Sequence, residues 1–130
     1  MLARELAAYI AEHLGGTLGV DIEIGEIPSS SGDTLMLYNA ASPAPDNELA
    51  VEEQRIDFWV RYKNSKTGYD RLASIKDLFH RNNNWTLGST HYIYEAEAVG
   101  LIDDMDRDLN NRKIWKLGMT FVYRELIDVS

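Results

Sequence analysis

The sequence EEQRIDFWVRY, residues 52–62, alternates between two sets of side chains. A strand places successive residues on opposite faces of a sheet, so a period of two predicts a β-strand here. One face should carry Ile56, Phe58, Val60 and Tyr62, and the other should carry Arg55, Asp57, Trp59 and Arg61. One face of the strand is therefore mostly apolar, and the other consists of charged residues and a tryptophan.

Helical periodicity follows this strand directly. Thr67-Gly68-Tyr69-Asp70 has the form of a capping box, with Thr67 as the N-cap and Asp70 at position N3. The helical stripe after it consists of Leu72, Ile75, Leu78 and Phe79. Residues 82–84, three asparagines, are expected to end the helix.

An earlier helix is predicted over residues 2–14. Its apolar stripe recurs every four residues and consists of Leu2, Leu6, Ile10 and Leu14, with Ala3 and Ala7 beside them. Gly15-Gly16 should stop it, because glycine adopts the left-handed conformation at a helix end without steric cost.

Further strands are predicted over residues 20–24 and 34–38, with a long irregular loop over residues 39–48. In the last third, Tyr92, Tyr94, Ala96 and Ala98 should share one face of a strand, opposite His91, Ile93, Glu95 and Glu97. The final strand should bury Trp115, Leu117, Met119, Phe121 and Tyr123 on one side. Between these two strands, the acidic segment 103–111 is expected to be the loop of a hairpin.

These elements predict an α+β fold in the order α-β-β-β-α-β-β. The expected architecture is a mostly antiparallel sheet of about five strands with two helices packed on it. The 130 residues fit one domain, residues 1–130. No apolar run approaches the roughly 18 residues of a membrane span, so no membrane association is expected.

The net charge of −8 is distributed unevenly along the chain. Residues 1–57 hold eleven acids and two bases, whereas residues 58–130 hold eleven bases and ten acids. This balance lacks the basic footprint of a general DNA-binding protein. It is compatible with an acidic surface of one subunit meeting a basic surface of a neighbour, or simply with a soluble acidic surface.

The segments that resemble catalytic or metal-binding motifs each lack residues that the motif requires. Asp104-Met105-Asp106-Arg107-Asp108 resembles the start of an EF-hand loop, but Leu109 replaces the required glycine and Trp115 the bidentate glutamate. The glycine run 15–19 follows a helix rather than preceding one, which is the wrong order for a phosphate loop. The chain has no cysteine, and its three histidines lack zinc-binding spacing. We therefore expect neither enzymatic activity nor a cofactor.

Trp59 is the most informative single residue. It lies on the charged face of its strand, between Asp57 and Arg61. Exposed tryptophan and arginine together are typical of protein interfaces. The alternative interpretation is that Trp59 packs under the loop over residues 39–48.

Several of these segments together resemble tail terminator, or tail-completion, proteins of long-tailed bacteriophages, some of which are described as minor capsid proteins. The resemblance is carried by the N-terminal helix, the Pro-rich loop and the segments Asp21–Pro28, Leu35–Tyr38, Gln54–Arg61 and Arg112–Arg124. It covers nearly the whole chain. This family has no catalytic residues to transfer.

The resemblance implies a structural protein of the virion, at the neck between head and tail, made in the cytoplasm of the bacterial host. Such proteins form a ring, usually a hexamer, on the tail tube. The ring stops tube polymerisation and presents a surface to the head-side connector, and DNA passes through its lumen without specific binding. A ring uses a heterologous interface, in which two different surfaces of one subunit meet.

The charge distribution then suggests which residues form the interface. The expected subunit-interface residues are Trp59, Arg61, Lys63, Lys66, Arg71, Lys76, Arg81, Glu48, Glu52 and Glu53. Three other functions stay open on the sequence alone. They are another neck or tube component, a small ligand-binding or enzymatic α+β domain, and an adaptor that acts as a monomer or dimer.

Overall fold

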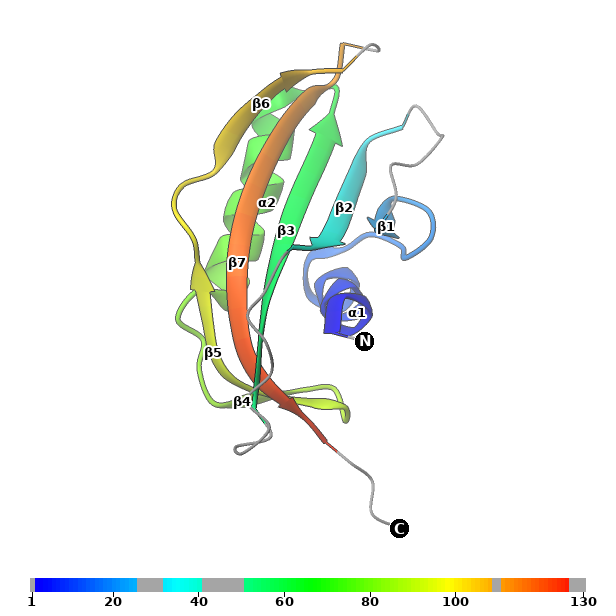
Figure 1. Cartoon of the computed structure of the whole chain (residues 1–130). Coiled ribbons are helices and arrows are strands. Elements are labelled where there is room, and N and C mark those ends of the chain that lie inside the picture. The colour runs from blue at the N-terminus through cyan, green and yellow to red at the C-terminus, as the bar shows by residue number, and fades with distance from the viewer. Residues whose placement is uncertain (1, 26–31, 41–50, 109–110, 127–130) are drawn as a thin grey trace.

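The computed structural model describes residues 2–25, 32–40, 51–108 and 111–126. Two helices and seven strands are present in this part of the chain (Figure 1). In chain order they are α1 (Leu2–Leu14), β1 (Ile22–Ile24), β2 (Thr34–Asn39), β3 (Glu52–Tyr62), α2 (Ser65–Phe79), β4 (Trp85–Leu87), β5 (His91–Ala98), β6 (Asp103–Arg107) and β7 (Lys113–Glu125). The α+β class and the two helices are confirmed.

The sheet differs from the predicted one. Its strands lie in the order β1-β2-β3-β7-β5-β4, and β6 also pairs with β7. The β1–β2 pair is parallel, so the sheet is mixed, and it has seven strands rather than about five. Strands β3 and β7 are long and strongly curved, and the sheet curls into a half-barrel (Figure 1).

The helices cover one face of this sheet. Helix α2 lies behind β3 and β7, and α1 lies beside β2 (Figure 1). The fully buried core side chains come from both helices and from alternate positions of the central strands: Leu6, Ala7, Ile10, Leu72, Ile75, Phe79, Ile56, Phe58, Val60, Leu117, Met119 and Phe121. The predicted faces of β3 and β7 and the stripes of both helices are thus confirmed.

Helix α1 ends where the sequence predicted. Gly15 and Gly16 have φ angles of 88° and 110°, values that residues with a Cβ rarely adopt. At Gly16 a Cβ would also lie 2.8 Å from Cδ1 of Ile22. The two glycines therefore turn the chain and allow it to pass closely against β1.

Helix α2 begins three residues earlier than predicted. Its N-cap is Asn64, whose side-chain oxygen accepts a hydrogen bond of 3.0 Å from the backbone N–H of Thr67. The predicted capping box with Thr67 as N-cap is therefore wrong, because asparagine is at least as good an N-cap as threonine and lies one turn upstream. The helix also ends at Phe79, before the asparagines. Neither described helix is long and apolar enough to span a membrane.

Two predictions in the last third are wrong for local reasons. The register of β5 against β7 shifts between Ile93 and Glu95, which is a β-bulge at Tyr94. Because a bulge adds one residue to one strand, the period of two is interrupted. His91, Ile93 and Ala96 are consequently buried together.

The acidic segment after β5 is not simply a loop. Asp103–Arg107 forms strand β6, which pairs with β7 and whose residues are all exposed. Since none of these residues is buried, no apolar alternation marks the strand in the sequence. The predicted antiparallel pairing of the two flanking strands, β5 and β7, is confirmed.

Candidate assembly surface

The face of the sheet opposite the helices contains a groove. It has a volume of about 650 Å³ and crosses β2, β3 and β7. Its lining is mostly apolar and consists of Gly25, Met36, Tyr38, Asp57, Trp59, Arg61, Asp108 and Ile114. We call this feature the Trp59 groove, and the sheet face that carries it the open face.

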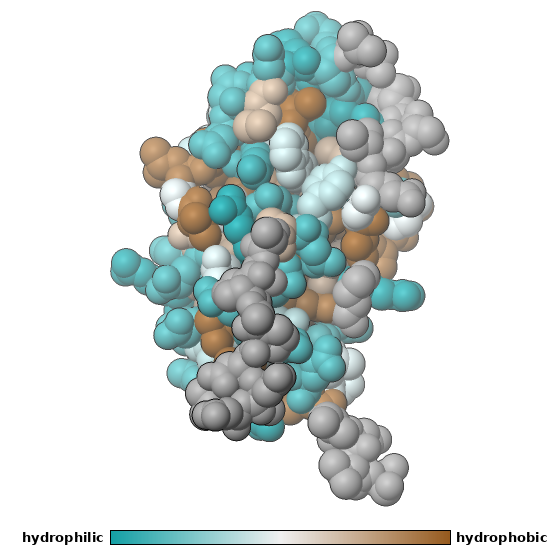
Figure 2. Space-filling view, in the orientation of Figure 1, coloured by the Kyte–Doolittle hydropathy of each residue, from teal (hydrophilic) through white to brown (hydrophobic). Residues whose placement is uncertain are grey.

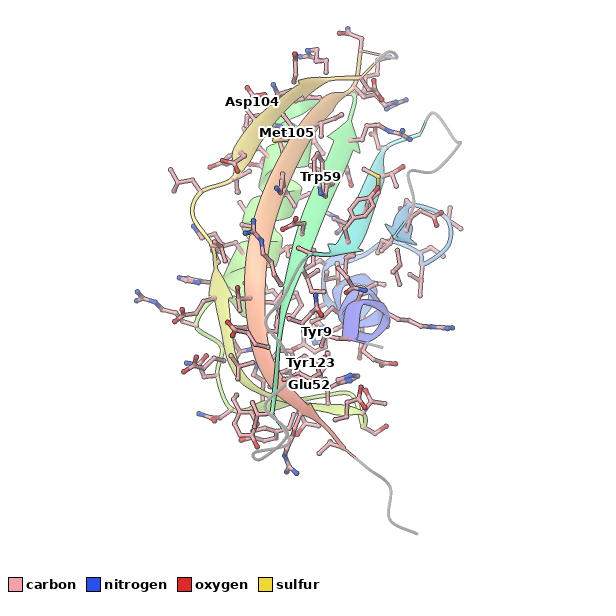
Figure 3. All side chains as sticks on the ribbon, viewed as in Figure 1. Tyr9, Glu52, Trp59, Asp104, Met105 and Tyr123 are labelled. Atoms are coloured by element: carbon pink, nitrogen blue, oxygen red, sulfur yellow. The ribbon has the colours of Figure 1, made fainter. Side chains whose placement is uncertain are left out.

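Trp59 lies near the middle of the open face (Figure 3). It is paired with Met36 of β2 and Lys116 of β7, so these three side chains lie side by side across the sheet. The Tyr38 ring stands edge-on to Trp59, with ring centroids 6.2 Å apart, and the Lys116 ammonium lies 5.5 Å from the indole centroid. The indole is thus held by neighbours on both sides while staying half-buried.

Charged pairs flank the groove at two places. Asp57 lies between Arg55, whose Nε is 3.0 Å from its Oδ1, and Lys116, whose Nζ is 3.8 Å from its Oδ2. Farther along β3, Arg61 Nε lies 3.6 Å from Oδ2 of Asp108, and Arg61 is 7% exposed. An apolar centre with charged margins is the usual composition of a protein interface.

A second, smaller hollow on the open face is acidic. It measures about 280 Å³ and lies where β3, β5 and β7 run together. Three glutamates line it: Glu53, Glu95 and Glu97. No lysine or arginine is among the described residues that line this hollow. The open face therefore combines an apolar groove with an acidic region.

The predicted interface residues are divided between two surfaces. Trp59, Arg61 and Glu53 lie on the open face. Four basic residues lie on or just after α2, in the helical layer on the other side of the sheet: Lys66, Arg71, Lys76 and Arg81. Lys63 follows β3 and is exposed. Glu48 lies outside the described residues.

Arg71 and Glu52 form side-chain hydrogen bonds that join separate elements of the chain. The Arg71 guanidinium donates to the carbonyl oxygens of Leu14 and Gly15, at 2.9 and 2.7 Å. Glu52 accepts a hydrogen bond from the hydroxyl of Tyr123, its cross-strand partner (Figure 3). Burial, together with this carboxylate, raises the pKa of Tyr123. Both interactions contribute to the fold of a single chain.

Comparison with known proteins identifies the family. A family model described as "Bacteriophage tail terminator protein" matches residues 9–125. The chain belongs to this family. It is therefore a structural protein of a phage tail.

A solved structure shows the same fold. It is a chain in a structure entitled "Virion of native gene transfer agent (GTA) particle", with a TM-score of 0.52 and 13% sequence identity. The similarity covers 95% of this chain and 94% of the other. No curated protein matches the chain.

Several groove residues of this terminator-family chain were not predicted. Met36, Tyr38 and Ile114 come from strands far from Trp59 in the sequence, and only the register of β2 and β7 brings them beside it. Asp108 belongs to the segment that resembles an EF-hand. Its carboxylate lies beside Arg61, whereas that of Asp104 pairs with Lys113, which holds the pKa of Asp104 below its usual range.

Proposed function

We propose that this chain forms a ring that caps the tail tube, stops its polymerisation and joins the tail to the head-side connector. The family match over residues 9–125 supports the terminator role. The Trp59 groove supports the assembly, because large half-buried aromatic residues with arginine neighbours are typical anchors of interfaces. We expect a ring, most simply a hexamer, built from one heterologous interface repeated around an axis.

The interface proposal includes the residues named from the sequence, now divided between two surfaces. Trp59, Arg61 and Glu53 lie on the open face, and the exposed cations Lys63, Lys66 and Arg81 lie elsewhere on the chain. Acidic and basic surfaces at different places on one subunit suit head-to-tail contact. Glu48, Glu52, Arg71 and Lys76 complete the proposed set. Among these, Arg71 and Glu52 also have intrachain roles.

DNA passage is part of the same proposal. A ring on the tail tube encloses the path of DNA, and the chain carries a net charge of −8. Cations that neutralise phosphates release counterions and retain DNA. An acidic lumen avoids this retention and lets DNA slide.

A tube-length assay tests the proposal. Tail tube protein is polymerised with increasing amounts of this chain, and tube lengths are measured by negative-stain electron microscopy. We expect shorter tubes with extra density at one end. In the absence of tail tube protein, this chain should form no tubes. Long tubes formed by the chain itself would favour a tube subunit, and unchanged, uncapped tubes would contradict the terminator role.

A further inference from the structure

A hydrophobic projection lies at the edge of the sheet where β5 leads into β6. Val99, Leu101 and Met105 are 44%, 78% and 39% exposed. Gly100, with a φ of 80°, turns the chain between the first two. Figure 2 shows hydrophobic residues protruding along this edge, at the left of the view. We call these three residues the 99–105 knob.

The Val99 end of the knob lies far from the opposite side of the groove in its own chain. Tyr38 pairs with Asp57, which pairs with Gly118, and the Gly118 carbonyl accepts from the backbone N–H of Val99. Three strand spacings of ~4.8 Å therefore separate Tyr38 from Val99, or about 14 Å. Met105, at the other end of the knob, lies between Asp104, which pairs with Trp115, and Arg107, which pairs with Lys113, and is therefore beside Ile114 at the near margin of the groove. Val99 and the far side of the groove are separate surfaces of one subunit, which is the arrangement that a heterologous interface requires.

The two surfaces have complementary charge. Residues 95–106 contain five acids and no base, of which Asp104 is already paired with Lys113: Glu95, Glu97, Asp103, Asp104 and Asp106. At the margins of the groove, three cations meet two acids: Arg55, Arg61 and Lys116 against Asp57 and Asp108. The lining of the groove itself holds one cation and two acids, so the attraction for an acidic projection comes from Arg55 and Lys116 at its margins.

Local hydrogen bonds occupy two backbone donors at the end of this edge strand. The N–H of Asp106 donates to Oδ1 of Asp104 at 3.0 Å, and the N–H of Arg107 donates to Oδ1 of Asp106 at 2.9 Å. Asp106 also has a φ of 74°. Occupied donors and an irregular backbone protect an edge strand from adding another strand. Strand addition at the end of β6 is therefore disfavoured, and the knob supplies side chains for a different kind of contact.

We propose that the 99–105 knob of one copy inserts into the Trp59 groove of the next copy. The volume of about 650 Å³ has room for more than one aliphatic side chain. Leu101 contacts the Trp59 indole, and the acids beside the knob face Arg55 and Lys116. This inference rests on the proposed function, because it adds an apolar contact to the charged residues proposed for the ring interface.

Engineered disulfides test the contact, and the chain has no native cysteine. Leu101→Cys lies in the knob and Tyr38→Cys lines the groove. Their separation within one chain exceeds the roughly 7 Å limit between Cα atoms for a disulfide. Assembled on tail tubes and oxidised, the double variant should give a ladder of covalent oligomers on a non-reducing gel. An equal mixture of the two single variants should give covalent dimers only.

The matched control is Val20→Cys combined with Tyr38→Cys, because Val20 is an exposed apolar residue, 68% exposed, outside the knob. This pair should give no ladder. A second test is Leu101→Asp, which should weaken association at least tenfold, whereas Val20→Asp should not. Because both side chains are largely exposed, neither change should unfold the chain.

The outcomes separate this inference from the proposed function. If the wild-type chain forms rings on tubes but the knob and groove cysteines give no ladder, the contact is wrong and the terminator role stands. A Leu101→Asp variant that associates as tightly as wild type would also overturn the contact. If the wild-type chain does not oligomerise on tubes, the proposed function itself fails.

Discussion

Arg71 connects the two helices through its guanidinium. It donates to the carbonyl oxygens of Leu14 and Gly15, which lie at the end of α1 and lack helical partners there. A cation at this position also interacts favourably with the negative end of the helix dipole. Arg71 therefore stabilises the single chain, whatever part it has in assembly.

Replacing Arg71 tests this role. Arg71→Met keeps much of the aliphatic stem but removes these two hydrogen bonds and the side-chain hydrogen bond with Tyr62, so we expect the free energy of unfolding to fall by about 1–2 kcal/mol. Lys66→Met is the control, since Lys66 forms only an exposed ion pair with Asp70 on the same helix and should contribute little. Urea unfolding at pH 7 measures both. Equal stability of Arg71→Met and wild type would rule out the capping role.

His91 should make stability depend on pH. Burial lowers its pKa, against the opposing effect of the carboxylates of Glu125, Glu5 and Glu52. Its side chain is buried beside Tyr123, and its Nε2 has no hydrogen-bond partner among the described residues. The folded state therefore favours neutral His91, while the unfolded chain takes up the proton near pH 6.5.

The free energy of unfolding should therefore decrease as the pH falls below about 6.5. This decrease should continue until the pH reaches the lower pKa that His91 has in the folded state. The loss from this one group cannot be steeper than about 1.4 kcal/mol per pH unit. His91→Gln, which does not titrate, should reduce the loss between pH 7 and pH 5.5 in urea unfolding. His13→Gln, at an exposed position, should keep it. An unchanged pH dependence in His91→Gln would show that other groups cause it.

At the scale of elements, the start of α2 allows a direct test between two caps. Asn64 provides the N-cap in the structure, while the sequence also offers Thr67. Asn64→Ala should therefore lower the free energy of unfolding by about 1 kcal/mol. Thr67→Ala should have a smaller effect, because only its backbone N–H takes part in the cap. The reverse order in thermal unfolding would mean that the helix starts at the predicted capping box.

Elements with regular periodicity could be predicted from the sequence. The bounds of α1 and β3 agree with the prediction because each element buries regularly spaced residues of one face against the core. The faces of β5 could not be predicted, because the bulge at Tyr94 depends on pairing with β7. Strand β6 has no buried residue and hence no hydrophobic pattern.

The candidate site was predictable only in part, for a related reason. Trp59 stands out because it interrupts a charged face, and the structure places it in a groove. Its neighbours Met36 and Ile114 belong to distant strands, and their proximity depends on the registers of β2 and β7. Local sequence does not encode register between distant strands, so the groove could not be predicted from the sequence.

At the scale of the whole molecule, the open face and the helical layer should respond differently to mutation. Trp59→Ala should weaken self-association strongly, while stability falls by less than the 3–5 kcal/mol typical of a fully buried tryptophan. Trp85→Ala is the matched control. Trp85 is also half-buried but packs against Tyr9 and Phe79 on the helical side.

Sedimentation velocity of both variants, at concentrations where both are folded, measures the difference. Trp85→Ala should destabilise the fold and leave association unchanged. Equal loss of association in the two variants would indicate a general effect on folding rather than an interface at Trp59.

The central claim is that copies of this chain close into a ring on the tail tube. Native mass, measured at several concentrations alone and with tail tube, tests it most directly. We expect a single discrete oligomer that binds at the end of the tube. Its mass should not increase with further increases in concentration, because a closed ring leaves no interface open. A chain that stays monomeric and does not bind tubes, or that forms oligomers of unlimited length, would contradict the claim.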